Sequence, residues 1–183
     1  MSVVLVADIF GRTTALTTLA KELDAAVIVD PYDGVDMGFS HEAQAYAYFM
    51  AQVGIEAYCL VLLKTLASTL TVTDLVGFSV GAAVIWKLSE HQSLKQIRRG
   101  ICYYGSQIRN FKQLNPLFEL ELIFPKLEGH FDVEQLQTEL STKQNVKASK
   151  VDYLHGFMNA CSTNYDPLGY QQQLNWLQLR LKP

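Results

Sequence analysis

Short apolar runs alternate along this chain with longer stretches of helical character. Nearly continuous apolar runs are typical of strands that are buried on both faces, as in a parallel sheet. We predict six such strands, over Val3–Ala7, Ala25–Val29, Asp74–Phe78, Gly100–Tyr104, Leu120–Phe124 and Val146–Tyr153. The helices predicted between them cover Thr13–Leu23, about Glu42–Leu66, Gly81–Glu90, Val133–Leu140 and Tyr170–Leu181. The alternation predicts an α/β fold: a doubly wound, mostly parallel six-stranded sheet with helices on both faces.

Composition and charge limit the classes of protein that the chain can belong to. Its 183 residues, 49% hydrophobic and 18% charged, suit a single compact domain over residues 1–183. The formal net charge is −3 and the densest basic cluster is only Arg98-Arg99, so we expect no nucleic-acid partner. Charged residues or histidines interrupt every apolar stretch before the ~20 residues of a membrane span, so we expect no membrane partner. The apolar stretch 49–66 suits a buried helix, which we favour, or the contact face of a homodimer.

The first residues and the cysteines favour a cytoplasmic location. Residues 1–8 lack the basic start and the cleavage site of a signal peptide, and we interpret them as the first strand. The three cysteines are widely spaced and form no CxxC pair, so we expect neither a disulfide framework nor a structural zinc site. Nothing in the sequence implies a metal or an organic cofactor.

Residues 77–81 read Gly-Phe-Ser-Val-Gly between a predicted strand and a predicted helix. This context is typical of a nucleophile elbow, in which small glycines let the chain reverse sharply. The Ser79 hydroxyl would then be exposed at a helix N-terminus, where backbone N–H groups and the helix dipole favour developing negative charge. We therefore predict that Ser79 is a nucleophile; the alternative is an ordinary N-cap serine.

A serine nucleophile needs a general base, and in folds with this elbow the chain order is serine, acid, histidine. His155 follows the last predicted strand, where such a histidine occurs, and we predict that it is the base. His130 lies in the preceding loop and suits the rim of the site better. His41 precedes the nucleophile, and His91 lies at the far end of the helix that Ser79 opens.

The acid is expected in the loop over residues 124–134, where two carboxylates compete. Asp132 precedes a helical run and has Gln135 three residues on, a capping-box pattern that gives it a structural role. Glu128 lies earlier in the loop and has no capping task. We favour Glu128 as the acid that orients His155, with Asp132 as the alternative.

With these features the chain resembles the dienelactone hydrolase family of α/β-hydrolases over nearly its whole length. The elbow and the histidine loop are the specific part of the resemblance, which rests on Asp8-Ile9-Phe10-Gly11, Asp30-Pro31-Tyr32-Asp33-Gly34, Gly77 to Gly81, Tyr103-Tyr104-Gly105, His155-Gly156-Phe157-Met158-Asn159 and Asn164-Tyr165-Asp166-Pro167. The resemblance implies a compact α/β-hydrolase fold and a triad of Ser79, His155 and Glu128. It also implies an oxyanion hole formed by the backbone N–H groups of Ile9 and Val80.

Four positions depart from the family pattern, and one of them is Glu128, which stands where the family has an aspartate. Ser79 stands where the namesake enzyme has cysteine, although many relatives have serine there. Asn159 stands where the family has an arginine that binds the substrate carboxylate, so an anionic lactone would lack a bidentate partner. Asp8 stands where the family has a longer glutamate that interacts with the resting nucleophile; a strand-end cap is its alternative role. The chain is also short for the family, which implies a more open pocket.

Ligands of doubly wound folds bind beyond the carboxyl ends of the strands. The residues that we predict to line a substrate pocket there are Asp8, Phe10, Tyr32, Tyr104 and Phe157, although aromatic residues at such positions also serve as core. We expect a carboxylic ester hydrolase similar to dienelactone hydrolase, with a small ester, thioester or lactone as its substrate. The alternative is a catalytically silent module of the same fold that binds a small molecule or has a regulatory role.

Overall fold

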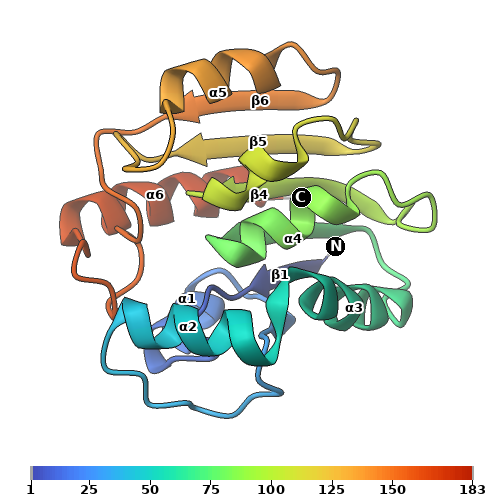
Figure 1. Cartoon of the computed structure of the whole chain (residues 1–183). Helices are drawn as coiled ribbons and strands as arrows, with labels where there is room; N and C mark the ends of the chain where they lie inside the picture. Colours follow the sequence, from blue (N-terminus) through green and yellow to red (C-terminus); the bar gives the residue numbers. More distant parts are fainter. Residues whose placement is uncertain (1, 183) are drawn as a thin grey trace.

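Six parallel strands form one sheet in the computed structural model, which describes residues 2–182 (Figure 1). Their order across the sheet is β2-β1-β3-β4-β5-β6, and every neighbouring pair is parallel. The strands are β1 (Ser2–Val6), β2 (Val27–Val29), β3 (Thr73–Phe78), β4 (Ile97–Tyr103), β5 (Glu119–Phe124) and β6 (Val146–Lys150). The predicted α/β class is therefore confirmed, with a sheet that is parallel throughout.

Helices cover both faces of the sheet and bury two separate apolar clusters. Those in the described residues are α1 (Thr14–Glu22), α2 (Glu42–Gln52), α3 (Gly54–Ala67), α4 (Val80–Leu88), the 3-10 helix η1 (Ser106–Phe111), α5 (Val133–Ser141) and α6 (Pro167–Arg180). Residues of α2, α3, α4, η1 and α5 pack against one face, and residues of α1 and α6 pack against the other. Figure 1 shows the first group in front of the sheet and α1 and α6 behind it. This is the doubly wound arrangement that the sequence predicts.

Polar side chains mark the point at which three of the helices begin. Thr13, Asp132 and Asp166 each accept a hydrogen bond from the backbone N–H three residues ahead, at 3.1, 3.0 and 2.8 Å. Pro167 follows Asp166 in the first turn of α6, where its missing N–H costs nothing. Such caps stabilise a helix by ~1 kcal/mol each.

The helix predicted over about residues 42–66 is two helices, α2 and α3, and the prediction of one continuous helix is wrong. The chain breaks at Val53 and Gly54, which has a φ of +73° that side-chain-bearing residues rarely adopt. The axes of the two helices differ by 78°, so α2 turns away from α3. No single described helix is long and apolar enough to cross a membrane; α2 and α3 meet those criteria only together, as this bent pair.

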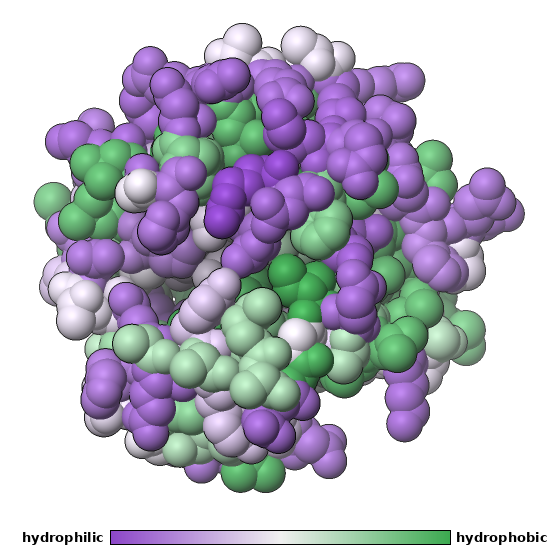
Figure 2. Space-filling model, in the orientation of Figure 1, coloured by the Kyte–Doolittle hydropathy of each residue, from purple (hydrophilic) through white to green (hydrophobic). Residues whose placement is uncertain are grey.

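One side of α3 is buried and the other side is exposed. Leu62 and Leu66 are fully buried in the core, whereas Leu60 and Val61 are exposed. Figure 2 shows hydrophobic side chains over α3 on a face that is otherwise largely hydrophilic. The burial that we favoured for this stretch therefore describes one side of the helix only.

The last strand is shorter than predicted, because β6 ends at Lys150 and not at Tyr153. Two further backbone hydrogen bonds, from Val151 N–H to Phe124 and from Lys126 N–H to Tyr153, hold the next residues beside β5 without regular pairing. The chain then leaves the sheet and forms the loop that carries His155. This loop lies beyond the carboxyl end of the sheet, where the candidate site is built.

Candidate active site

Ser79 lies between the end of β3 and the start of α4 in a strained backbone conformation. Its φ of 50° and ψ of −112° are rare for any residue with a side chain and cost ~1–3 kcal/mol. A Cβ atom on Gly81 would lie 2.5 Å from the carbonyl oxygen of Ala7, and one on Gly77 would lie 2.9 Å from the backbone nitrogen of Ala82. Only glycine therefore fits at either position, and the tight turn that results presents the Ser79 hydroxyl beyond the sheet.

His155 lies between Ser79 and Glu128 in space. The Ser79 hydroxyl lies 3.0 Å from His155 Nε2, and Glu128 Oε1 lies 2.7 Å from His155 Nδ1. The histidine side chain is 29% exposed and that of Glu128 only 11%, so the carboxylate is largely shielded from water. In this geometry the serine hydroxyl can donate to Nε2 while Nδ1–H donates to the carboxylate.

Asp132, the competing acid, does not reach the histidine. Its carboxylate accepts the Gln135 N–H at 3.0 Å and caps α5. The structure therefore brings Glu128, and not Asp132, to His155. His130 lies in the same loop, is exposed and lines the rim of the cavity described below.

The loop that carries His155 is held by contacts that the sequence did not predict. Asn164 donates a side-chain hydrogen bond to the His155 carbonyl at 2.9 Å. The Ser162 hydroxyl donates to Glu42 at the start of α2. The Tyr104 ring lies 5.0 Å from the imidazole, centroid to centroid. These contacts come from three separate elements, so no local pattern of residues could have indicated them.

The backbone N–H groups of Ile9 and Val80 are candidate donors for an oxyanion. Both residues line the same cavity as Ser79. Within residues 2–182 neither N–H donates to a protein acceptor, whereas the N–H groups of Phe10 and Gly11 both donate to Asp8. Two unused donors beside a serine hydroxyl can bind an oxygen that carries negative charge.

A cavity of about 300 Å³ opens over Ser79 and His155. Asp8, Phe10 and Tyr104 line it, as predicted from the sequence. Asn159, which takes the place of the family's arginine, lines it too, and lining residues that were not predicted include Glu42, Tyr46, Ser106, Gln107 and Ser162. Those from α2 and from the histidine loop are far from any strand end, so the strand-end rule could not find them.

Two of the predicted pocket residues, Tyr32 and Phe157, do not line this cavity, and their prediction as pocket residues needs correction. The Tyr32 hydroxyl donates to the Ile9 carbonyl at 2.7 Å, and the ring lines a separate groove beside β2. Phe157 is fully buried and stacks on Tyr153 with ring centroids 5.0 Å apart. Both aromatic residues support the loops of the site from behind.

Asp8 binds the histidine loop and has no hydrogen bond to Ser79. Its carboxylate accepts the Phe10 N–H at 2.9 Å and the Asn159 side-chain N–H at 2.5 Å. Burial raises the pKa of this carboxyl to about 6, although both hydrogen bonds and the nearby His155 lower it.

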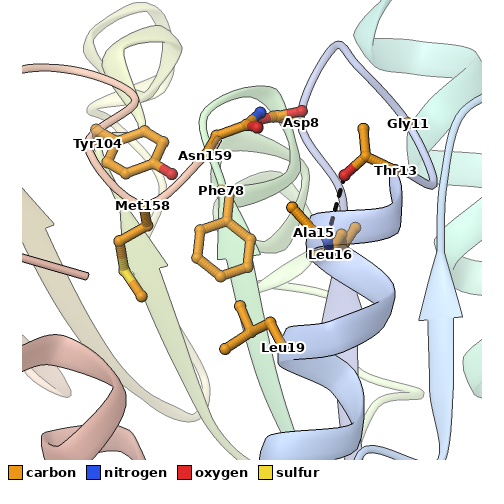
Figure 3. A pocket seen from close by; sticks show the side chains of 10 residues that line it. All are labelled: Asp8, Gly11, Thr13, Ala15, Leu16, Leu19, Phe78, Tyr104, Met158 and Asn159. Carbon is orange, nitrogen blue, oxygen red and sulfur yellow. Dashed lines mark hydrogen bonds between the residues drawn. The ribbon is translucent and has the colours of Figure 1, made fainter. Parts of the chain in front are cut away.

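A second, smaller cavity adjoins the first at Asp8, Tyr104 and Asn159, which line both (Figure 3). Within residues 2–182, no group of three or more His, Cys, Asp or Glu side chains could hold a metal ion.

Comparison with known proteins relates the chain to α/β-hydrolases by its fold. No family model matches the sequence. Over 93 residues, 50% of this chain, the sequence is 39% identical to the uncharacterized protein YczH of Bacillus subtilis (strain 168), and the match spans only 45% of YczH.

Solved structures match over almost the whole chain. A proposed dienelactone hydrolase of Klebsiella pneumoniae superimposes with a TM-score of 0.69 at 14% identity, covering 96% of this chain and 85% of its own. A dienelactone hydrolase-like promiscuous phosphotriesterase from metagenomic libraries gives 0.69 at 12% identity, covering 98% and 84%. An α/β serine hydrolase homologue of Coxiella burnetii gives 0.62 at 17% identity, covering 99% and 85%. The chain therefore has a dienelactone hydrolase-like α/β-hydrolase fold, as its sequence predicts.

Proposed function

We propose that this chain is a serine hydrolase that cleaves a small ester, thioester or lactone through an acyl-enzyme. The observation that carries the proposal is the hydrogen-bonded series from Ser79 through His155 to Glu128, with distances of 3.0 and 2.7 Å. The strained backbone of Ser79 and the chain order serine, acid, histidine support it. The hydrolases and esterases among the proteins of similar fold support it as well.

In the proposed reaction, His155 Nε2 removes the hydroxyl proton as Ser79 Oγ attacks the carbonyl carbon. The N–H groups of Ile9 and Val80 bind the resulting oxyanion, and the loss of one such donor typically slows catalysis ~10²–10³-fold. His155 then gives the proton to the leaving oxygen or sulfur. A water molecule, deprotonated by the same imidazole, releases the acid and restores Ser79. Glu128 holds Nδ1–H in place and stabilises the imidazolium.

The cavity limits the substrate to a small molecule. Its volume of about 300 Å³ is at the low end of the ~300–1,000 Å³ typical of ligand pockets. Asn159 has no charge with which to bind a substrate carboxylate, so an anionic lactone is a poor candidate. The competing function is small-molecule binding without turnover, since a fold does not fix a reaction.

Labelling with a fluorophosphonate probe tests the proposal, because the probe reacts with an activated serine only. We expect one adduct per chain by intact mass, on a peptide that contains Ser79, and no adduct in Ser79→Ala. Ser141→Ala is the matched control, because this serine lies on the exposed side of α5 and should not affect labelling. Wild-type protein that takes up no probe, and hydrolyses no member of a panel of short esters, thioesters and lactones, would support the binding module instead.

A further inference from the structure

Two buried polar groups beside the candidate nucleophile have no complete set of partners in the chain. Asp8 is 9% exposed and accepts two N–H groups, but among residues 2–182 no lysine or arginine pairs with it. The Tyr104 hydroxyl is buried and makes no hydrogen bond of ordinary geometry with a described group, although the Met158 backbone lies close enough to oppose the rise in its pKa that burial causes. Buried charges are normally paired, and buried hydroxyls normally hydrogen-bonded, so both groups call for a ligand or a water molecule.

Both groups line the small second cavity. Figure 3 shows Asp8 and Asn159 end to end above this cavity and the Tyr104 hydroxyl directed into it from the side of β4. The remaining wall is apolar, with Phe78, Leu16 and Leu19, apart from Thr13, whose hydroxyl caps α1. The cavity volume of about 20 Å³ leaves room for one group of the size of water or of ammonium. The site thus combines the Asp8 carboxylate, the Tyr104 hydroxyl and room for one small polar group, beside the Thr13 hydroxyl and the Asn159 amide, which have partners of their own.

The larger cavity is negatively charged, like the Asp8 carboxylate of the small one. Its described lining contains three carboxylates, Asp8, Glu42 and Glu128, and no lysine or arginine. Glu128 is paired with His155, and Glu42 accepts the Ser162 hydroxyl, so Asp8 is the carboxylate that adjoins the small cavity. With a pKa of about 6, raised by burial, Asp8 is still mostly ionised at neutral pH. A cation is favoured in this site and an anion is repelled.

We propose that the substrate carries a primary ammonium group, which binds in the small cavity between the Asp8 carboxylate and the Tyr104 hydroxyl. This inference rests on the proposed hydrolase function and specifies its substrate class. The ammonium has three N–H donors. One can reach the carboxylate, which becomes a charge-assisted pair, and one can reach the lone pairs of the tyrosine oxygen. The preferred substrate is then an ester, thioester or lactone with an amino group a few bonds from the reacting carbonyl.

A series of three p-nitrophenyl esters of nearly equal size tests the proposal on the full chain. The β-alanyl ester ends in ammonium, the butyryl ester in methyl and the hemisuccinyl ester in carboxylate. Each kcat/KM is measured at pH 7.5 above the spontaneous background, and the β-alanyl and butyryl values are divided by their rates of hydroxide-catalysed hydrolysis, because the ammonium group also activates the ester. The hemisuccinyl value is left undivided, because its own carboxylate speeds spontaneous hydrolysis. We expect the corrected value for β-alanyl to exceed that for butyryl about tenfold or more, which is the worth of one charge-assisted hydrogen bond. The undivided value for hemisuccinyl should be the lowest of the three.

Two variants test whether Asp8 and Tyr104 cause the preference for the β-alanyl ester. Asp8→Asn should reduce the ratio of β-alanyl to butyryl hydrolysis to near one, and Tyr104→Phe should reduce it several-fold. The second variant removes a hydroxyl that makes no hydrogen bond of ordinary geometry with a described group, so the fold should suffer little. Glu42→Gln is the control for the general negative field, because Glu42 lines the large cavity but not the small one. It should change the ratio much less than Asp8→Asn.

The outcomes separate this inference from the function on which it rests. If none of the three esters is hydrolysed, the proposed function fails. If butyryl is hydrolysed at least as well as β-alanyl after correction, the hydrolase stands and the ammonium site is excluded, with the small cavity left to a water molecule. An equal loss of preference in Asp8→Asn and Glu42→Gln would also overturn the assignment of the small cavity as the site.

Discussion

Glu128 Oε1 lies 2.7 Å from His155 Nδ1, although 27 residues separate the two in the sequence. The contact forms because β5 and β6 are parallel neighbours, so the loops that follow them leave the sheet at the same edge. Asp132, four residues after Glu128, already belongs to the start of α5, and its carboxylate is turned toward Gln135. One loop thus supplies an acid for the site and a cap for a helix, and the two tasks do not compete.

Replacing Glu128 and Asp132 one at a time separates the role of triad acid from that of helix cap. Glu128→Gln should leave the fold intact and reduce kcat severely, because the amide can stabilise the wrong tautomer of His155. The loss should approach the ~10⁴-fold of the equivalent change in a serine protease. Asp132→Asn should change kcat little, since asparagine is also a good N-cap. Steady-state hydrolysis of p-nitrophenyl butyrate measures both. Loss of activity in Asp132→Asn alone would refute this choice of acid but leave the hydrolase proposal intact.

Activity should also fall in acid. The proposed base is the neutral imidazole of His155, and the imidazolium cannot accept the Ser79 proton. The measurement is kcat/KM of p-nitrophenyl butyrate between pH 5 and 9, with buffers of equal ionic strength. His155→Ala should be inactive across the whole range. Wild-type activity that does not vary with pH, or a His155→Ala variant that retains activity, would exclude this histidine as the base.

The fold and the order of its elements could be predicted because each rests on local patterns. The apolar runs of the six strands, the Gly-Phe-Ser-Val-Gly turn and the capping pattern at Asp132 are all contiguous in the sequence. The break between α2 and α3 was missed, because Val53 and Gly54 interrupt a stretch whose other residues are all compatible with one helix. A single glycine inside such a stretch is a weak signal, and only its positive φ in the structure identifies the bend.

The parts of the site that depend on contacts between distant residues could not be predicted. Glu42 reaches the histidine loop through Ser162, 120 residues away, and no pattern links these positions. Tyr32 and Phe157 follow strand ends like true pocket residues, yet their rings turn away from the cavity. The direction of a side chain in a loop depends on its neighbours in three dimensions, which the strand-end rule does not contain.

The elbow glycines give a prediction about stability. Gly81→Ala should destabilise the fold by about 2 kcal/mol or more, because its Cβ would lie 2.5 Å from a backbone oxygen of Ala7 that cannot move aside. Gly129→Ala is the matched control: no atom lies within 4 Å of its added Cβ, so a change within about 0.5 kcal/mol is expected. Urea unfolding followed by circular dichroism measures both. Equal stability of the two variants would contradict the close approach between α4 and β1.

The buried carboxyl of Asp8 gives a prediction about the pH dependence of stability. Its pKa is raised from 3.8 to about 6 by burial, so the folded state holds this proton more tightly than the unfolded state does. The stability that Asp8 contributes is therefore complete below pH ~4 and is lost as the pH rises through about 6. Asparagine cannot ionise, so the Asp8→Asn variant should not lose this stability as the pH rises.

The free energy of unfolding of Asp8→Asn minus that of wild type should thus increase, in favour of the folded variant, by about 2 kcal/mol between pH 4.5 and 7.5. The hydrogen bond to Asn159 that the variant also loses lowers its stability at both pH values, so the change in the difference isolates the ionisation. Urea unfolding of both proteins at the two pH values provides the measurement. A difference that stays constant, or that moves in favour of wild type at pH 7.5, would mean that Asp8 is not a carboxyl held against ionisation by burial. The main physical argument for an ammonium group bound to Asp8, that its buried carboxylate needs a positive partner, would then be lost.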